Sequence, residues 1–185
     1  MITDRQSLKE YLRADLAVAY VPKSAFKRWL MTIYGNEQCH AFRYVRWLRY
    51  TEYCLNTHHK LLYVFCHWRL SRLGLRYFMR IPLNVCGKGL NIIHLAGGGG
   101  CILNCKSIGD NCRIQSGVII GAVDIPENKP VIGNNVSFKI GSKAYGKITI
   151  GDNVDVLANA VVTKDIPANA IVGGIPAKVI KFKEQ

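Results

Sequence analysis

Acidic residues are scarce in this sequence. The chain of 185 residues has 12 Asp and Glu against 25 Lys and Arg, which gives a formal net charge of +13. From Tyr53 to Gly109 there is no acid at all, and this stretch holds the bases Lys60, Arg69, Arg72, Arg76, Arg80, Lys88 and Lys106. Such a surface suits phosphates, anionic lipid or an acidic glycan, although roughly half of such runs are solvated helix faces only. No nucleic-acid partner is predicted.

Long apolar runs and a secretory leader are also missing. The start of the chain has no basic stretch followed by an apolar one, so no signal peptide is predicted. The most apolar N-terminal stretch, Leu61–Cys66, is far shorter than the roughly 20 residues that cross a bilayer. We therefore expect a cytoplasmic protein, peripheral to a membrane if its basic helices contact one.

Paired cysteines are absent as well. The chain has seven cysteines, an odd number, and none stands in CxxC spacing. This pattern argues against a disulfide framework and against a zinc site. We expect reduced, mostly buried thiols and no bound metal.

Residues 1–80 are predicted to form a basic helical region. A leucine recurs every four residues at positions 8, 12 and 16, and Ser7 with Glu10 forms a capping-box pattern. Further helices are expected at 24–34, 41–55 and 61–78. Their faces alternate aromatics with arginines, which fits either a small aromatic-packed bundle or a surface that contacts a membrane or a glycan.

A different period governs the rest of the chain. From Ile102 onward a bulky apolar residue returns every six positions, and only Pro126 and Ala144 depart from this rule: Ile102, Ile108, Ile114, Ile120, Pro126, Ile132, Phe138, Ala144, Ile150, Val156 and Val162. Three similar pentads mark the same register, namely Ile108–Cys112, Ile132–Val136 and Ile150–Val154. A period of six fits neither a helix nor a simple hairpin array, and it is typical of a hexapeptide β-helix.

Each hexad is expected to supply one short strand and one turn. The bulky residue points into the coil, and so does a smaller residue four places on: Cys112, Val118, Val136, Ser142, Val154 and Ala160. The Gly-Asp-Asn element of the pentads supplies turn conformations with positive φ. Since three hexads make one coil, residues 102–162 predict roughly three to four coils.

Three further segments carry a resemblance: Gly87–His94, Gln115–Gly121 and Ala158–Lys178, the last ending in Gly-Ile-Pro-Ala-Lys. With them, residues 81–181 resemble the hexapeptide-repeat acyltransferases, and among these the serine acetyltransferase-like branch. The resemblance implies an α+β fold class. It predicts a short N-terminal helical region at 1–80, followed at 81–185 by a left-handed parallel β-helix that forms an acetyltransferase domain.

Other families share hexapeptide repeats, among them nucleotidyltransferases and γ-class carbonic anhydrases. The carbonic anhydrases need three histidines to hold zinc. The β-helix part of this chain has only His94, so we exclude that function. The Gly-Ile-Pro-Ala-Lys ending is a specific mark of the acetyl-CoA users.

The resemblance implies that His94 is the catalytic base and acetyl-CoA the co-substrate. Acetyl transfer to a hydroxyl needs a base that takes the proton and donors that hold the oxyanion, and imidazole suits the first task. The run Gly97–Gly100 exposes backbone N–H groups, which either serve as oxyanion donors or only make a tight corner.

Coenzyme A is expected in a groove between neighbouring coils. By resemblance the pantetheine runs along Gly121, Ala122, Ile140, Gly141, Ala158 and Asn159. Lys164 and Lys178 are then candidates for its phosphates. Each small residue, taken singly, is as readily explained as an ordinary coil corner.

Three positions depart from the serine acetyltransferases. The aspartate that orients their histidine is here Met79, and the acid before that histidine is Ile93. Their Arg-His pair, which with that acid holds the amino acid's charged groups, is here Asn128-Lys129. These losses favour a sugar hydroxyl, as in capsular or exopolysaccharide synthesis, over serine.

The repeat is interrupted at 122–130, which we interpret as the acceptor loop, with Asp124, Glu127, Asn128 and Lys129 as its polar residues. Asp124 or Glu127, supplied by a neighbouring subunit of a homotrimer, is a candidate for the missing orienting acid. Two alternatives stay open: a serine O-acetyltransferase of cysteine biosynthesis, and a non-catalytic scaffold that binds membrane or glycan through the basic helices.

Overall fold

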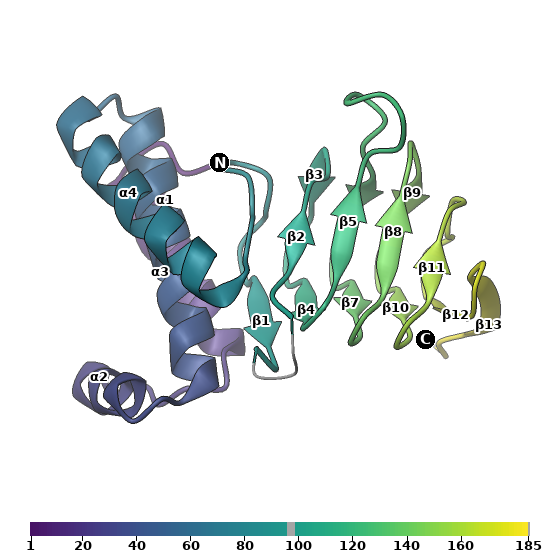
Figure 1. Ribbon diagram of the computed structural model, residues 1–185, viewed down its shortest axis with the longest axis horizontal. Coiled ribbons are helices and arrows are strands. Elements are labelled where there is room, and N and C mark those ends of the chain that lie inside the picture. Colours follow the sequence, from purple (N-terminus) through teal and green to yellow (C-terminus); the bar gives the residue numbers. More distant parts are fainter. Residues whose placement is uncertain (96–98, 185) are drawn as a thin grey trace.

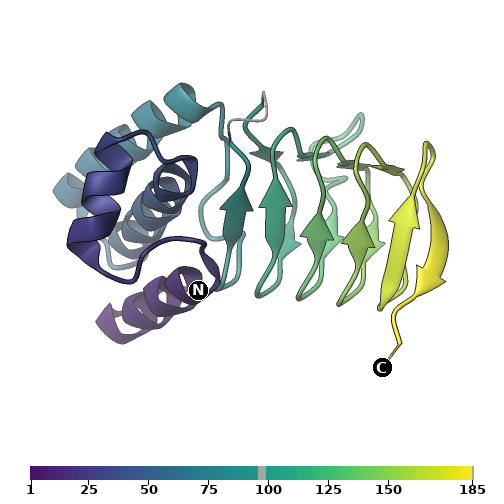
Figure 2. The same cartoon turned by 90° about the horizontal axis from the view of Figure 1, so that it is seen from below.

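The computed structural model describes residues 1–95 and 99–184, and in this part of the chain a group of helices leads into a parallel β-helix. The helices pack against one end of the β-helix, and the C-terminus lies at its other end (Figures 1 and 2). We call the helices together the helical head; they are α1 (Arg5–Val18), α2 (Ala25–Ile33), α3 (Glu37–Asn56) and α4 (Lys60–Tyr77).

The β-helix has three sheets, one for each side of its coils. The first contains β1 (Asn91–Ile93), β4 (Arg113–Gln115), β7 (Ser137–Phe138), β10 (Asp155–Val156), β12 (Ala170–Gly173) and β13 (Lys178–Phe182). The second contains β2 (Ile102–Leu103), β5 (Ile119–Gly121), β8 (Lys143–Tyr145) and β11 (Val161–Val162), and the third β3 (Ser107–Ile108), β6 (Val131–Ile132) and β9 (Thr149–Ile150). All pairs are parallel except β12 with β13. The predicted fold class is confirmed, with about four coils.

The interior of the coils follows the six-residue register with two exceptions. From Ile108 to Val162 the predicted inward positions are buried except Pro126, which is exposed in the loop that interrupts the repeat. All six of the smaller residues are buried as well. Ile102 is 43% exposed, and Leu103 is fully buried in its place. Leu103 lies in register with Ile120, seventeen positions on rather than eighteen. The connection between β2 and β3 is one residue short, so the prediction for Ile102 was wrong.

The Gly-Asp-Asn elements form one corner of the β-helix. The asparagine, and not the glycine, takes the positive φ there, at Asn111, Asn135, Asn153 and also Asn169. Their amides form a ladder: Asn135 Nδ2 donates to Asn153 Oδ1 at 3.0 Å, and Asn153 Nδ2 to Asn169 Oδ1 at 2.9 Å. Asn tolerates the left-handed region and its amide pairs with the next coil, which explains why this residue recurs.

Two helices begin earlier than predicted. Asp4, and not Ser7, caps α1, because Asp4 Oδ1 accepts the N–H of Ser7 at 2.7 Å. The third helix begins at Glu37 instead of 41, because Asn36 Oδ1 accepts the N–H of Cys39 at 3.0 Å. The other two helices lie within one residue of the prediction.

A buried charged network joins the helical head to the first coil. Arg49 of α3 pairs with Asp15 of α1 at 2.9 Å and with Glu52 at 3.1 Å. Its guanidinium also donates to the backbone oxygens of Cys86 and Gly87. Burial alone would lower the pKa of Arg49, but the charges of Asp15 and Glu52 outweigh burial and raise it. Head and β-helix also share one hydrophobic core.

Two further observations concern the sequence-based expectations. All seven cysteines are buried, as predicted. Within residues 1–95 and 99–184, no helix has the length and apolar character needed to span a bilayer.

Candidate functional site

His94 lies at the corner that follows β1, where the β-helix meets the helical head. Its backbone is left-handed, with φ at 62°, and its side chain is 53% exposed. A positive φ is uncommon outside glycine and asparagine, and such residues concentrate at functional sites. The imidazole is therefore accessible to a substrate. The left-handed backbone at this corner sets the direction in which the side chain leaves the chain.

Glu37 is an acid beside this histidine that the sequence did not indicate. Its Oε1 lies 3.9 Å from His94 Nδ1, and its side chain is 32% exposed. Gln38 Nε2 donates to the same oxygen at 3.3 Å. Glu37 is the first residue of α3, where the helix dipole favours a carboxylate. It escaped the sequence analysis because the predicted helix began later.

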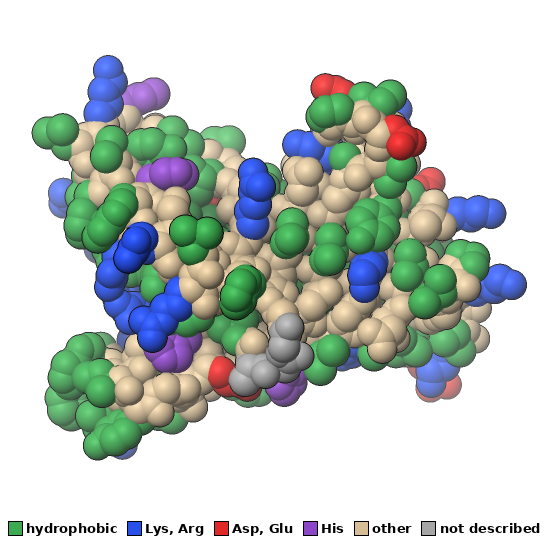
Figure 3. Space-filling view, viewed as in Figure 1, with side chains coloured by type: hydrophobic (Ala, Val, Ile, Leu, Met, Phe, Trp, Pro, Cys, Tyr) green, Lys and Arg blue, Asp and Glu red, His purple; other side chains and the backbone are tan. Residues whose placement is uncertain are grey.

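Two of the positions that depart from the serine acetyltransferases are apolar and buried. Met79 and Ile93 are 4% and 6% exposed. The chain leaves β1 at the lower edge in Figure 1, whereas the loop after β5, residues 122–130, rises from the upper edge. Figure 3 shows acidic side chains at the tip of that loop. Within one chain, Asp124 and Glu127 thus belong to a different corner from His94.

The predicted oxyanion run is only partly described. Gly97 and Gly98 lie outside the described residues. The N–H of Gly99 donates to Ser116 Oγ at 3.2 Å, and Gly100 packs against the backbone of Phe78 so closely that a side chain would not fit. For Gly99 and Gly100 the structure favours a tight corner.

The predicted coenzyme residues fall into two groups. The parallel strands of the first sheet end at the corner of His94, and the antiparallel β13 begins there. One line with His94 is therefore shared by Ile140, Gly141, Ala158, Asn159 and the turn before Lys178. Gly121, Ala122, the acceptor loop with Asn128 and Lys129, and Lys164 follow strands of the second sheet, at the next corner. One chain therefore brings only the first group to the side of His94.

The corner line of His94 is built from small residues. Gly117, Gly141 and Asn159 have positive φ and stack on one another. The Gly-Ile-Pro-Ala-Lys turn continues the line, because Val161 N–H donates to Gly174 O at 3.0 Å and Ala177 N–H to Val161 O at 2.8 Å. Ile175 and Pro176 are joined by a cis peptide bond. A line of small residues that continues to Lys178 fits an extended thiol chain with phosphates at its far end.

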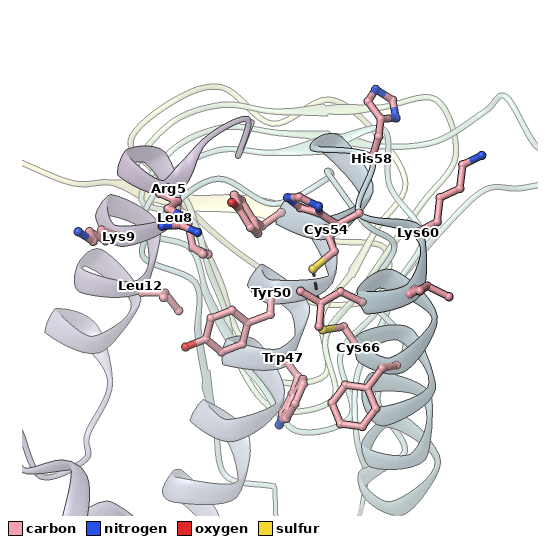
Figure 4. A pocket seen from close by; sticks show the side chains of 15 residues that line it. Arg5, Leu8, Lys9, Leu12, Trp47, Tyr50, Cys54, His58, Lys60 and Cys66 are labelled. Atoms are coloured by element: carbon pink, nitrogen blue, oxygen red, sulfur yellow. Dashed lines mark hydrogen bonds between the residues drawn. The ribbon is translucent and has the colours of Figure 1, made fainter.

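A large cavity of the helical head lies away from His94. It has a volume of about 1070 Å³ and opens between α1, α3 and α4 (Figure 4). Aromatic and aliphatic side chains such as Trp47 and Tyr50 form its walls, and Cys54 Sγ lies 4.0 Å from Cys66 Sγ inside it. No predicted site residue lines it. Among the described residues no group of His, Cys, Asp and Glu could hold a metal ion.

Comparison with known proteins identifies the relatives of this chain. It is 40% identical over 96 residues to the serine acetyltransferase of Synechococcus elongatus, which covers 51% of this chain and 38% of that protein. It is also 40% identical over 111 residues to that of Staphylococcus aureus, 57% of this chain and 51% of the relative. The matches thus span about half or less of the relatives' own length. No protein-family model matches the chain.

Solved structures extend the likeness to the whole fold. Serine acetyltransferase of Neisseria gonorrhoeae superposes with a TM-score of 0.74 at 20% identity, over 98% of this chain and 69% of that one. That of Brucella abortus in complex with coenzyme A gives a TM-score of 0.71 at 21% identity, over 97% of this chain and 70% of that one. The resemblance to the serine acetyltransferase type is confirmed. At these identities the solved structures establish the fold alone, which is a left-handed β-helix preceded by a helical head.

Proposed function

We propose that this protein is an O-acetyltransferase that uses acetyl-CoA. The observation that carries the proposal is the corner line itself, with an exposed, left-handed His94 at one end and the turn before Lys178 at the other. The sequence matches to serine acetyltransferases, and the coenzyme A complex of the Brucella relative, support it.

In the proposed reaction, His94 removes the proton from an acceptor hydroxyl while its oxygen attacks the thioester carbon. The C–O bond forms, the tetrahedral oxyanion collapses, and the C–S bond breaks. The thiolate of coenzyme A then takes the proton back from the imidazolium. Base catalysis of this kind contributes typically about 10²- to 10⁴-fold, and no covalent enzyme intermediate is needed.

Serine is the acceptor that the relatives favour, because the proteins that match in sequence are serine acetyltransferases. A sugar hydroxyl is the second candidate. It is supported by the buried, apolar Ile93 next to His94 in the chain and by the uncharged Asn128 in the loop, since the ammonium and carboxylate of an amino acid need charged partners. A sugar hydroxyl places no such demand on the site.

The acceptor is tested by incubating the protein with acetyl-CoA and either L-serine or a panel of neutral hexoses, and by measuring released thiol. Rapid turnover with serine assigns the first acceptor, and turnover with sugars alone assigns the second. If no hydroxyl compound releases thiol above the rate of hydrolysis, the acetyltransferase proposal is wrong.

The acceptor loop and His94 lie at different corners of one chain, which supports a homotrimer in which a neighbouring copy brings its loop to the base. In a trimer the two groups of coenzyme residues would also face each other across a subunit interface. Sedimentation at several protein concentrations tests this part of the proposal.

We also propose that Glu37 orients His94. The carboxylate at 3.9 Å from Nδ1 stands on the side of the ring away from Nε2, so it can hold the tautomer in which Nε2 accepts a proton. It stabilises the imidazolium formed during the reaction. Glu37 then has the orienting role that an aspartate at position 79 would have.

The Glu37→Gln protein is expected to lose about 10- to 100-fold in kcat with little change in KM, as for other outer carboxylates that orient a histidine. Glu37→Asp should recover part of the rate.

Glu10→Gln, which removes an exposed acid from α1, is the matched control and should leave kcat and KM unchanged. A merely structural role for Glu37 would lower the melting temperature without lowering kcat at temperatures where the protein is folded. If Glu37→Gln keeps the kcat of the natural protein, the orienting role is wrong.

A further inference from the structure

Four arginines of the helical head gather around one hollow. Arg69, Arg72 and Arg76 follow one another at spacings of three and four residues, which places them on one face of α4. Arg43 of α3 joins them, and together with Leu73 and Leu75 they line a hollow of about 420 Å³. Arg43 and Arg69 are half-buried, and the other two are exposed.

None of the four is neutralised by the described part of the chain. Every ion pair of an arginine found there belongs to Arg49, and α4 contains no acid. Burial, together with the charges of Arg76 and Arg43, lowers the pKa of His40, which shows that these cations converge. Like charges this close repel one another, and a bound anion would remove that cost.

Arg49 differs from these four arginines in that its guanidinium group is fully paired. The fold buries that arginine with two carboxylates and two backbone oxygens around it. An arginine that serves only the fold is therefore fully paired in this protein. The four arginines of the hollow have no such partners among the described residues, so their guanidinium groups are available to a ligand.

Exposed apolar side chains accompany the arginines on α4. Leu75, which lines the hollow, is 76% exposed, and Trp68 on α4 and Phe78 at its end are 54% and 77% exposed. Figure 3 shows Lys and Arg side chains gathered over the helices with hydrophobic side chains on both sides of them. A ligand that carries an anionic group next to an apolar part would match both features.

We propose that Arg43, Arg69, Arg72 and Arg76 bind the phosphate group of an organic phosphate. Guanidinium groups suit phosphate because they donate two parallel hydrogen bonds and stay charged at every physiological pH. The phosphate comes either from a soluble compound or from the headgroup of a phospholipid. None of the proposed acetyl-transfer residues lines this hollow, so the site is independent of that reaction.

The test compares the full-length protein with a variant in which Arg69, Arg72 and Arg76 are all replaced by Gln. The matched control replaces Lys106, Lys147 and Lys181 by Gln, which removes the same charge from exposed positions of the β-helix. Two probes are used: inorganic pyrophosphate in calorimetry, and phosphatidylcholine vesicles with or without phosphatidylglycerol in co-sedimentation. Circular dichroism melting verifies that both variants fold.

The natural protein is expected to bind at least one probe, and the arginine variant to bind it at least about 10-fold more weakly, because three charge-assisted contacts are lost. The lysine control should stay within about 2-fold of the natural protein, since it keeps all of those contacts. Binding of pyrophosphate assigns a soluble phosphate. Binding only to vesicles with phosphatidylglycerol, weakened further by Trp68→Ser, assigns a lipid headgroup.

Two results would overturn the proposal. One is no binding of either probe by the natural protein. The other is an equal loss in the arginine variant and the lysine control, which would mean that net charge alone attracts the probes. Neither result depends on whether the protein transfers acetyl groups.

Discussion

The His94→Ala protein is expected to lose acetyl transfer by about 10²- to 10⁴-fold while it keeps its fold. His94 stands at the end of the corner line, its side chain is half exposed, and it is the proposed catalytic base. Without an imidazole, the acceptor hydroxyl must attack while it still holds its proton. Release of thiol from acetyl-CoA, followed with saturating acceptor, measures the loss.

His94→Asn is the better-matched companion variant. Asparagine adopts the left-handed region at smaller cost than alanine, so it preserves the φ of 62° at this corner. It also cannot act as a base near neutral pH. Both variants should bind coenzyme A as the natural protein does. Full acetyl transfer by His94→Asn would exclude base catalysis at this position.

Arg49→Leu is expected to lower the free energy of unfolding by about 3–5 kcal/mol. The substitution leaves Asp15 and Glu52 as buried carboxylates without their cation, and it also removes the donors to Cys86 O and Gly87 O. Breaking one partner of a buried pair is costly because the remaining charge cannot be solvated. Chemical denaturation followed by circular dichroism gives the value.

Arg13→Leu provides the control, because it removes an exposed arginine of α1. Its effect should stay within about 0.5 kcal/mol, as for most surface substitutions. If the two arginines prove equally dispensable, the network does not hold the head to the β-helix. A variant with Leu at 15, 49 and 52 should regain much of the stability, since no charge is then left unpaired.

Most of the β-helix was predictable because its physical cause is local. A side chain that points into a coil has no access to water, so the same chemical requirement recurs every six residues. The exception, Ile102, shows the limit of this argument. One residue fewer between β2 and β3 moves Leu103 into the interior, and only the pairing with Ile120 reveals it.

The candidate site was predictable only along the line of the first sheet. Gly141 and Asn159 are corner residues of successive coils, so their alignment follows from the repeat. His94 precedes the repeat, and the pairing of β1 with β4 places it on the same line. The sequence did not predict that the candidate coenzyme residues divide between two corners, because family resemblance takes no account of which side of a coil a residue occupies. Only the order of the strands in the three sheets shows this division.

By itself, the sequence determined that this protein has a β-helix with a basic helical head, since periodicity and composition act on each segment separately. The tertiary structure decided which charges meet. Glu37 lies beside His94 because α3 packs against the β-helix, and Arg43 lies beside the arginines of α4 because α3 packs against α4. Both contacts bring together residues that are far apart in the chain. Charges interact through space and not along the backbone, so no sequence pattern records these partnerships.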